Sequence, residues 1–100
     1  MNTDMLNMDE SHFKINEEIA AKKYEEAKAL YDEKQYAEAV QLISVLALQN
    51  YAPAQNSFGY CYANGQGITR DYVKAVEWFS KAAKQGYAKA QNNLGLCYSV

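Results

Sequence analysis

Residues 51–62 read YAPAQNSFGYCY, and residues 87–98 read YAKAQNNLGLCY. Eight of these twelve positions are identical at an offset of 36 residues. The match continues backwards at the same offset, because Tyr36 recurs as Tyr72. An internal period of about 34 to 40 residues is typical of helical solenoids, in which every repeat is a helix pair stacked on its neighbours.

Local sequence patterns predict where these helices begin and end. Apolar and small side chains over residues 72–86 recur every three or four positions, as on one face of an α-helix. Asn16 and Asp71 are the predicted N-caps, and Asn50 and Gly86, which are 36 residues apart, are the predicted left-handed C-caps. The patterns together predict five helices, over residues 17–33, 36–49, 53–63, 72–85 and 89–98.

Length and composition exclude several classes of protein. The 100 residues suffice for one small domain, and the net charge of −2 gives no electrostatic case for nucleic-acid binding. The sequence contains no apolar run long enough to span a membrane and no secretion signal, so we expect a cytoplasmic location. Charge is uneven, since residues 1–50 carry ten acidic and five basic side chains and residues 51–100 carry two and five.

The stretch from Ala52 to Gly86 closely resembles the Sel-one-like repeat (SLR), a relative of the tetratricopeptide repeat. Phe58 and Ile68 are mild departures from the SLR pattern, and Lys34 stands where a tetratricopeptide repeat often has Gly. The SLR pattern is matched by Ala54, Gln55, Gly59, Tyr62, Gly65, Gly67, Asp71, Lys74, Ala75, Glu77, Trp78, Phe79, Lys81, Ala82, Ala83 and Gly86.

This resemblance implies an all-α fold, a right-handed α/α superhelix of antiparallel helix pairs with about two and a half repeats. The expected segments are a mobile N-terminal arm (1–15), a tetratricopeptide-like helix pair (16–50), a full SLR (51–86) and the first helix of a further, incomplete repeat (87–100).

Two glycines lie inside the predicted helices, at equivalent positions of successive repeats. Gly59 and Gly95 occupy one repeat position, where Gly costs about 1 kcal/mol relative to Ala in a helix. We therefore expect both glycines to mark a close approach of neighbouring helices. The last helix is expected to expose Leu94 and Leu96, as in a partial repeat array.

No catalytic, metal or cofactor site is predicted. Cys61 and Cys97 are equivalent positions, about 8–10 Å apart in stacked helices, and are expected to be buried thiols without a disulfide. His12 is expected to be solvated. Ser11 and Lys14 match the S-x-x-K spelling of serine β-lactamases, but the companion motifs are absent.

The resemblance also implies where a partner would bind. In tetratricopeptide-like solenoids the first helix of each pair lines the concave face, which by position contains Tyr24, Lys28, Asn56, Tyr60, Asn92 and Leu96. The sequence thus predicts a non-catalytic scaffold or adaptor that binds a protein or peptide through this face. The alternatives are a purely structural N-terminal cap of a longer array, or a β-lactamase-type hydrolase.

Overall fold

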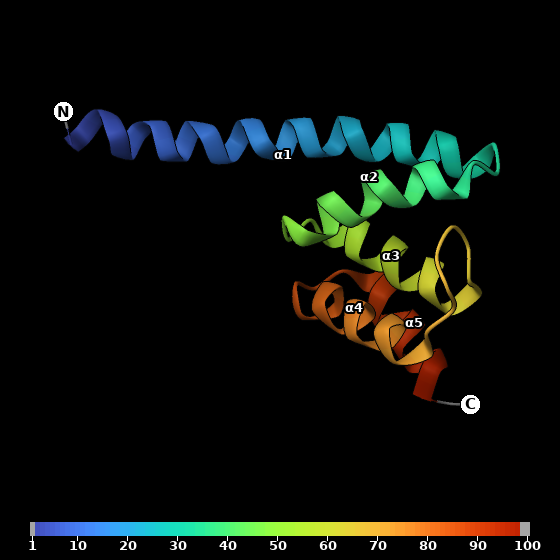
Figure 1. Ribbon diagram of the computed structural model, residues 1–100. Coiled ribbons are helices and arrows are strands. Elements are labelled where there is room, and N and C mark those ends of the chain that lie inside the picture. Colours follow the sequence, from blue (N-terminus) through green and yellow to red (C-terminus); the bar gives the residue numbers. More distant parts are fainter. Residues whose placement is uncertain (1, 99–100) are drawn as a thin grey trace.

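The computed structural model describes the backbone of residues 2–98 and the side chains of residues 17–98. These residues form helices and connecting turns, with no strand in the part described. The helices are α1 (Asn2–Asp32), α2 (Tyr36–Leu48), α3 (Ala52–Asn64), α4 (Tyr72–Lys84) and α5 (Ala88–Tyr98). Each helix packs against the one that follows it, so the fold is an all-α repeat (Figure 1).

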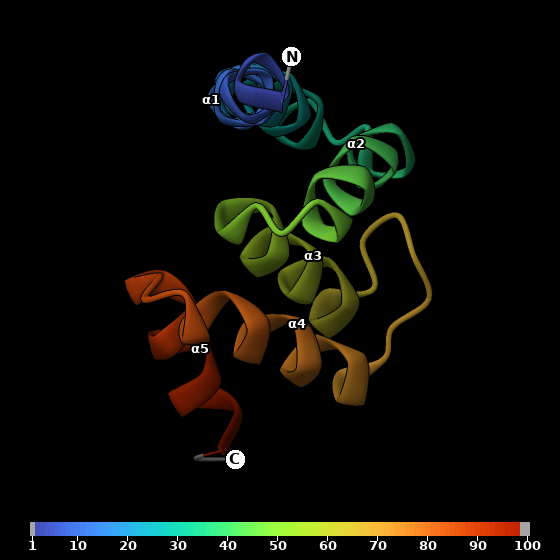
Figure 2. The same cartoon turned by 90° about the vertical axis from the view of Figure 1, so that its left-hand side faces the viewer.

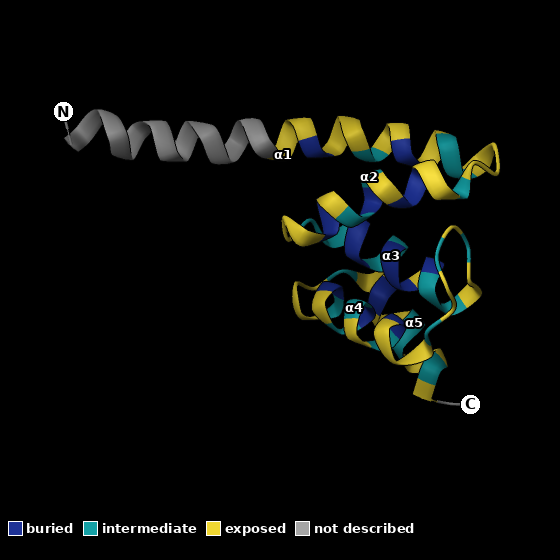
Figure 3. Ribbon diagram, in the orientation of Figure 1, coloured by how far each residue is buried: buried dark blue, intermediate teal, exposed yellow. Residues whose placement is uncertain are grey.

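The helices alternate between two sides of the molecule. Figure 2 shows α1, α3 and α5 along one side, with α2 and the loop before α4 on the other. The first helices of successive pairs therefore share one face. Buried residues lie where the helices face one another, and the outer sides are mostly exposed (Figure 3).

The bounds of α2 to α5 agree with the predicted helices to within one residue at each end. The start of the first helix was predicted wrongly, because α1 begins at Asn2 and Asn16 lies inside it rather than at its N-cap. The side chains of residues 1–16, including Ser11, His12 and Lys14, lie outside the described part, so the expectation of a mobile arm remains a prediction.

Small side chains dominate the core. Among the described side chains, seven of the fourteen buried apolar residues lie on α1 and α2, and alanine is the commonest type. Leu46 and Cys61 are the largest fully buried side chains. The buried apolar residues are Ala20, Ala27, Ala39, Val40, Ile43, Leu46, Ala47, Ala54, Phe58, Cys61, Ala75, Phe79, Ala82 and Ala90.

The turns after α1, α2 and α4 share one geometry. Lys34, Asn50 and Gly86 have φ angles of 65°, 67° and 86°, so the predicted left-handed C-caps Asn50 and Gly86 are confirmed. After α2, the Asn50 N–H donates to the carbonyl of Ala47, and the next N–H donates to the carbonyl of Leu46. These two bonds define a Schellman motif, which satisfies carbonyls left unpaired at a helix end.

One buried amide joins three helices. Gln55, on α3 and 2% exposed, donates from Nε2 to the Ala47 carbonyl oxygen at 3.2 Å and to Asn50 Oδ1 at 3.1 Å. Its Oε1 accepts from Gln85 Nε2, just after α4, at 2.9 Å. The bond to the preceding helix recurs one repeat later, since Gln91 Nε2 donates to the Ala83 carbonyl oxygen at 3.3 Å. This amide sets the positions of α2, α3 and α4 relative to one another.

The two repeat-equivalent glycines differ in their surroundings. A Cβ atom at Gly59 would lie 2.8 Å from two ring carbons of Phe79 and 3.0 Å from the Ala75 carbonyl oxygen. The predicted close approach is therefore confirmed between α3 and α4. At Gly95 the prediction is wrong for this structure, because nothing lies within 4 Å of the same position. Leu96 is 66% exposed as expected, whereas Leu94 is half-buried.

The loop between α3 and α4 also depends on a close approach. Gly67 has a φ of 73°, and a Cβ there would collide with the carbonyl oxygen of Tyr36 at the start of α2. Only Gly combines this backbone conformation with the required space. Ile68, the next residue, packs against the core.

Because Gly59 is closely packed and Gly95 is not, replacement by Ala should have opposite effects on stability at the two positions. Gly59→Ala should lower the free energy of unfolding by about 1–3 kcal/mol, because Phe79 is buried and cannot move aside without strain. Gly95→Ala meets no neighbour and should raise the free energy of unfolding by about 0.5–1 kcal/mol through helix propensity. Urea unfolding followed by circular dichroism measures both, and equal effects at the two sites would contradict the packing at Gly59.

The turn after α1 contains a position at which a substitution should stabilise the protein. Lys34 holds a positive φ of 65°, a conformation that strains any residue with a Cβ. Lys34→Gly should raise the free energy of unfolding by about 0.5–1 kcal/mol after allowing for the extra entropy of the unfolded chain. Lys22→Gly, at an exposed position within α1, is the control and should destabilise the protein.

Candidate functional site

A hollow of about 310 Å³ opens between α1 and α3. Three tyrosines contribute rings to it, one carboxylate and one ammonium group lie at its edge, and one aliphatic side chain comes from α2. Its lining consists of Tyr24, Lys28, Tyr31, Asp32, Ile43, Asn56, Ser57 and Tyr60. The hollow thus combines aromatic surface with hydrogen-bonding groups, as small binding sites generally do.

Four of the six residues expected on the concave face line this hollow, namely Tyr24, Lys28, Asn56 and Tyr60. They come in two pairs spaced four residues apart, on α1 and on α3, so each pair lies on one helix face. Asn92 and Leu96 lie on α5, where both are exposed, and they do not contribute to the hollow.

Several lining residues were not anticipated. Tyr31 and Asp32 follow Tyr24 by seven and eight positions, so helical spacing alone places them on the same face. Extending the strip by one turn of α1 would have identified both residues. Ile43 comes from α2 and forms part of the buried core, and no pattern in the sequence assigns it to a surface hollow.

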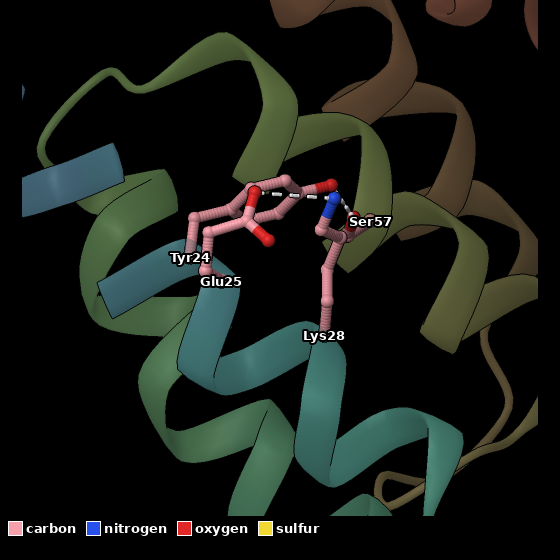
Figure 4. Close-up of polar contacts among 4 residues, drawn as sticks. All are labelled: Tyr24, Glu25, Lys28 and Ser57. Carbon is pink, nitrogen blue, oxygen red and sulfur yellow. Dashed lines mark hydrogen bonds and ion pairs between the residues drawn. The ribbon is translucent and has the colours of Figure 1, made fainter. Parts of the chain in front are cut away.

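A hydrogen bond links the two helices that form the hollow. The hydroxyl oxygens of Tyr24 and Ser57 lie 2.8 Å apart, as Figure 4 shows. The Tyr24 ring also packs edge-on against Tyr51, with 5.8 Å between ring centres. Burial raises the pKa of Tyr24 above its ordinary value, so its hydroxyl is protonated at neutral pH. These contacts fix the ring that forms one wall.

Lys28 is held by contacts within α1. Its Nζ lies 3.3 Å from Glu25 Oε1 and 5.4 Å from the centre of the Tyr24 ring (Figure 4). The hydrogen bond to Glu25 raises the pKa of Lys28 above its usual value. Because the pair is exposed, it contributes little to stability. Its consequence is that the charge of Lys28 is largely balanced beside the hollow.

Tyr31, near the end of α1, also lines the hollow. Its hydroxyl donates a hydrogen bond to Gln66 Oε1, in the loop before α4, and its ring packs edge-on against Tyr36 with 5.0 Å between centres. Burial raises the pKa of Tyr31, as it does for Tyr24. Tyr24 and Tyr31 are therefore neutral rings whose hydroxyl groups have partners inside the protein.

The face continues from α3 to α5 through an amide pair. Asn93 Nδ2 donates to Asn56 Oδ1 at 2.9 Å. Asn93, the residue that follows the expected face residue Asn92, therefore contacts Asn56.

Other chemistry sought in the sequence has little support in the described part. Cys61 and Cys97 are free thiols, the first buried and the second half-buried. Among the described side chains, no three His, Cys, Asp or Glu residues gather as a metal ion would require. The described helices also include none that is long and apolar enough to cross a membrane.

Residues 52–87 and 88–100 match the family model of the Sel1 repeat, the Sel-one-like repeat of the sequence analysis. The chain contains Sel1 repeats. The crystal structure of a Sel1 repeat protein from Oxalobacter formigenes is similar, with a TM-score of 0.70 and 34% sequence identity over 77% of this chain. The chain spans about a third of that protein, with 33% covered. Among curated proteins, none matches this chain.

The match to Sel1 repeats indicates a general role in protein–protein interaction. Sel1 repeats generally serve as scaffolds for protein–protein interactions. The family match covers the full repeat over α3 and α4 and the start of the next repeat, and the hollow lies at the junction between this repeat and the preceding helix pair.

The buried thiol gives a prediction that tests the packing beneath the hollow. Burial raises the pKa of Cys61 to about 11. At about pH 8 the thiolate fraction of Cys61 should then be roughly a hundredfold lower in the folded chain than after unfolding. The reaction of a Cys97→Ser variant with Ellman's reagent, in buffer and in urea, measures this difference. Comparable rates in the two solutions would contradict the burial of Cys61.

Proposed function

We propose that this chain is a non-catalytic scaffold that binds a protein or peptide partner through the face formed by α1, α3 and α5. The observation that carries the proposal is the hollow of about 310 Å³ between α1 and α3, lined by four of the residues expected to bind a partner. Location in the cytoplasm stays a prediction from the sequence.

The surface of the face supports this role. Tyr60 is 47% exposed on α3, and Leu96 is 66% exposed on α5. Tyrosines are frequent at binding surfaces because a rigid ring offers a large contact area with little loss of conformational entropy. The carboxamides of Asn56 and Asn92 are groups of the kind that hydrogen-bond a peptide backbone.

A pull-down with matched variants tests the proposal. The wild-type chain and an Asn56→Ala/Tyr60→Ala/Asn92→Ala variant serve as baits in lysate of the source organism, and mass spectrometry identifies the captured proteins. Glu38→Ala/Val73→Ala/Lys84→Ala is the control, because it changes three exposed positions elsewhere on α2 and α4. Circular dichroism melting establishes that all three proteins are folded.

We expect partners that are captured by the wild type and the control but lost from the concave-face variant. Loss is expected because removing a buried aromatic contact at an interface weakens binding by about 2 kcal/mol or more, or roughly thirtyfold. The same catch with all three baits would contradict binding through this face. Absence of any partner would instead favour the purely structural role, as a segment of a repeat array.

A further inference from the structure

We propose that the hollow between α1 and α3 binds an arginine side chain presented by the partner protein or peptide. The inference rests on the proposed function, because it specifies the chemistry of the partner that the scaffold would recognise. It follows from which groups around the hollow already have partners inside the protein and which do not.

The walls of the hollow suit a flat cation. Tyr24 and Tyr31 on α1 and Tyr60 on α3 contribute rings, and Ile43 adds aliphatic surface. The faces of such rings carry negative electrostatic potential and attract cations, and a guanidinium group stacks on them better than an ammonium group does. Lys28, with Nζ 5.4 Å from the centre of the Tyr24 ring, shows that one of these rings already attracts a cation.

The unpaired charge at the hollow is negative. Asp32 lines the hollow at the end of α1, and within the described residues it makes no ion pair or side-chain hydrogen bond. Lys28, the only cation among the described residues that line the hollow, is already paired with Glu25 at 3.3 Å. An incoming guanidinium therefore finds an available carboxylate, whereas an incoming carboxylate would face Asp32 and compete with Glu25 for Lys28. Arginine and carboxylate form two parallel hydrogen bonds, which adds specificity.

The charge distribution of the chain favours the same ligand. Residues 17–50 comprise the part of α1 with described side chains, α2 and the turns that follow these helices. They carry seven acidic and four basic groups. Residues 51–98 carry two acidic and five basic groups. A positively charged side chain is therefore attracted toward the α1 end of the face and repelled from the α4 and α5 end. The partner should present its arginine beside α1 and should have few basic residues beside α5.

An NMR titration of the whole chain tests this inference directly. Nα-acetyl-L-arginine N-methylamide is the probe, and the citrulline derivative, which has the same shape without the charge, is its control. The corresponding glutamate derivative tests the opposite charge. We expect saturable shifts of backbone amides around residues 24–32 and 56–60 with the arginine probe. Binding of the citrulline derivative should be at least about fivefold weaker, and the glutamate derivative should give no shifts at this site.

Two matched variants separate the role of Asp32 from a general effect of charge. Asp32→Asn should weaken binding of the arginine probe about tenfold, because it removes the carboxylate beside the rings. Glu33→Gln removes the same charge at the next residue, which is exposed and outside the hollow, and should change the affinity less than about twofold. Both positions are exposed, so both variants should fold.

Equal binding of the arginine and citrulline derivatives, unchanged affinity of Asp32→Asn, or shifts confined to other surfaces would overturn the arginine site. The titration needs no partner, so these outcomes leave the scaffold proposal to the pull-down. Conversely, a pull-down without partners does not alter the binding of arginine in the hollow.

Discussion

The arrangement of the repeats depends on the buried amide of Gln55. Its Nε2 donates to the Ala47 carbonyl at the end of α2 and to the Asn50 side chain, and its Oε1 accepts from Gln85 beyond α4. A buried amide without partners costs about 1–3 kcal/mol, so the three helices are held where all these bonds can form. Asn50 accepts its bond from Gln55 in a left-handed conformation, with a φ of 67°. The turn and the inter-helix network therefore stabilise each other.

Hydrogen bonds also shape the face that carries the hollow. On this face a hydrogen bond between the Tyr24 and Ser57 hydroxyl groups joins α1 to α3. The Tyr24 and Tyr31 rings are held by contacts on the protein side, while Asp32 and Tyr60 remain exposed. A rigid wall with a few available polar groups is the arrangement expected of a recognition surface.

Much of the helix layout could be predicted from local chemistry. Asp71 was predicted as an N-cap, and its Oδ1 accepts from the Lys74 backbone N–H at 3.1 Å. Caps and turns are local interactions within a few residues, so a single sequence contains the information that they require. Asn16 was assigned wrongly as a cap for the same reason, since a good capping residue also occurs inside helices.

The sequence by itself determined the repeat period and the bounds of α2 to α5, because these follow from periodicity and local hydrogen bonding. Only the tertiary structure decided that Gln55 is buried, that Asn93 contacts Asn56, and that Gly59 but not Gly95 is closely packed. Gly59 and Gly95 have the same residue type at the same repeat position, yet only the first faces another helix. Contacts between distant segments depend on which elements lie opposite, and no local pattern contains that information.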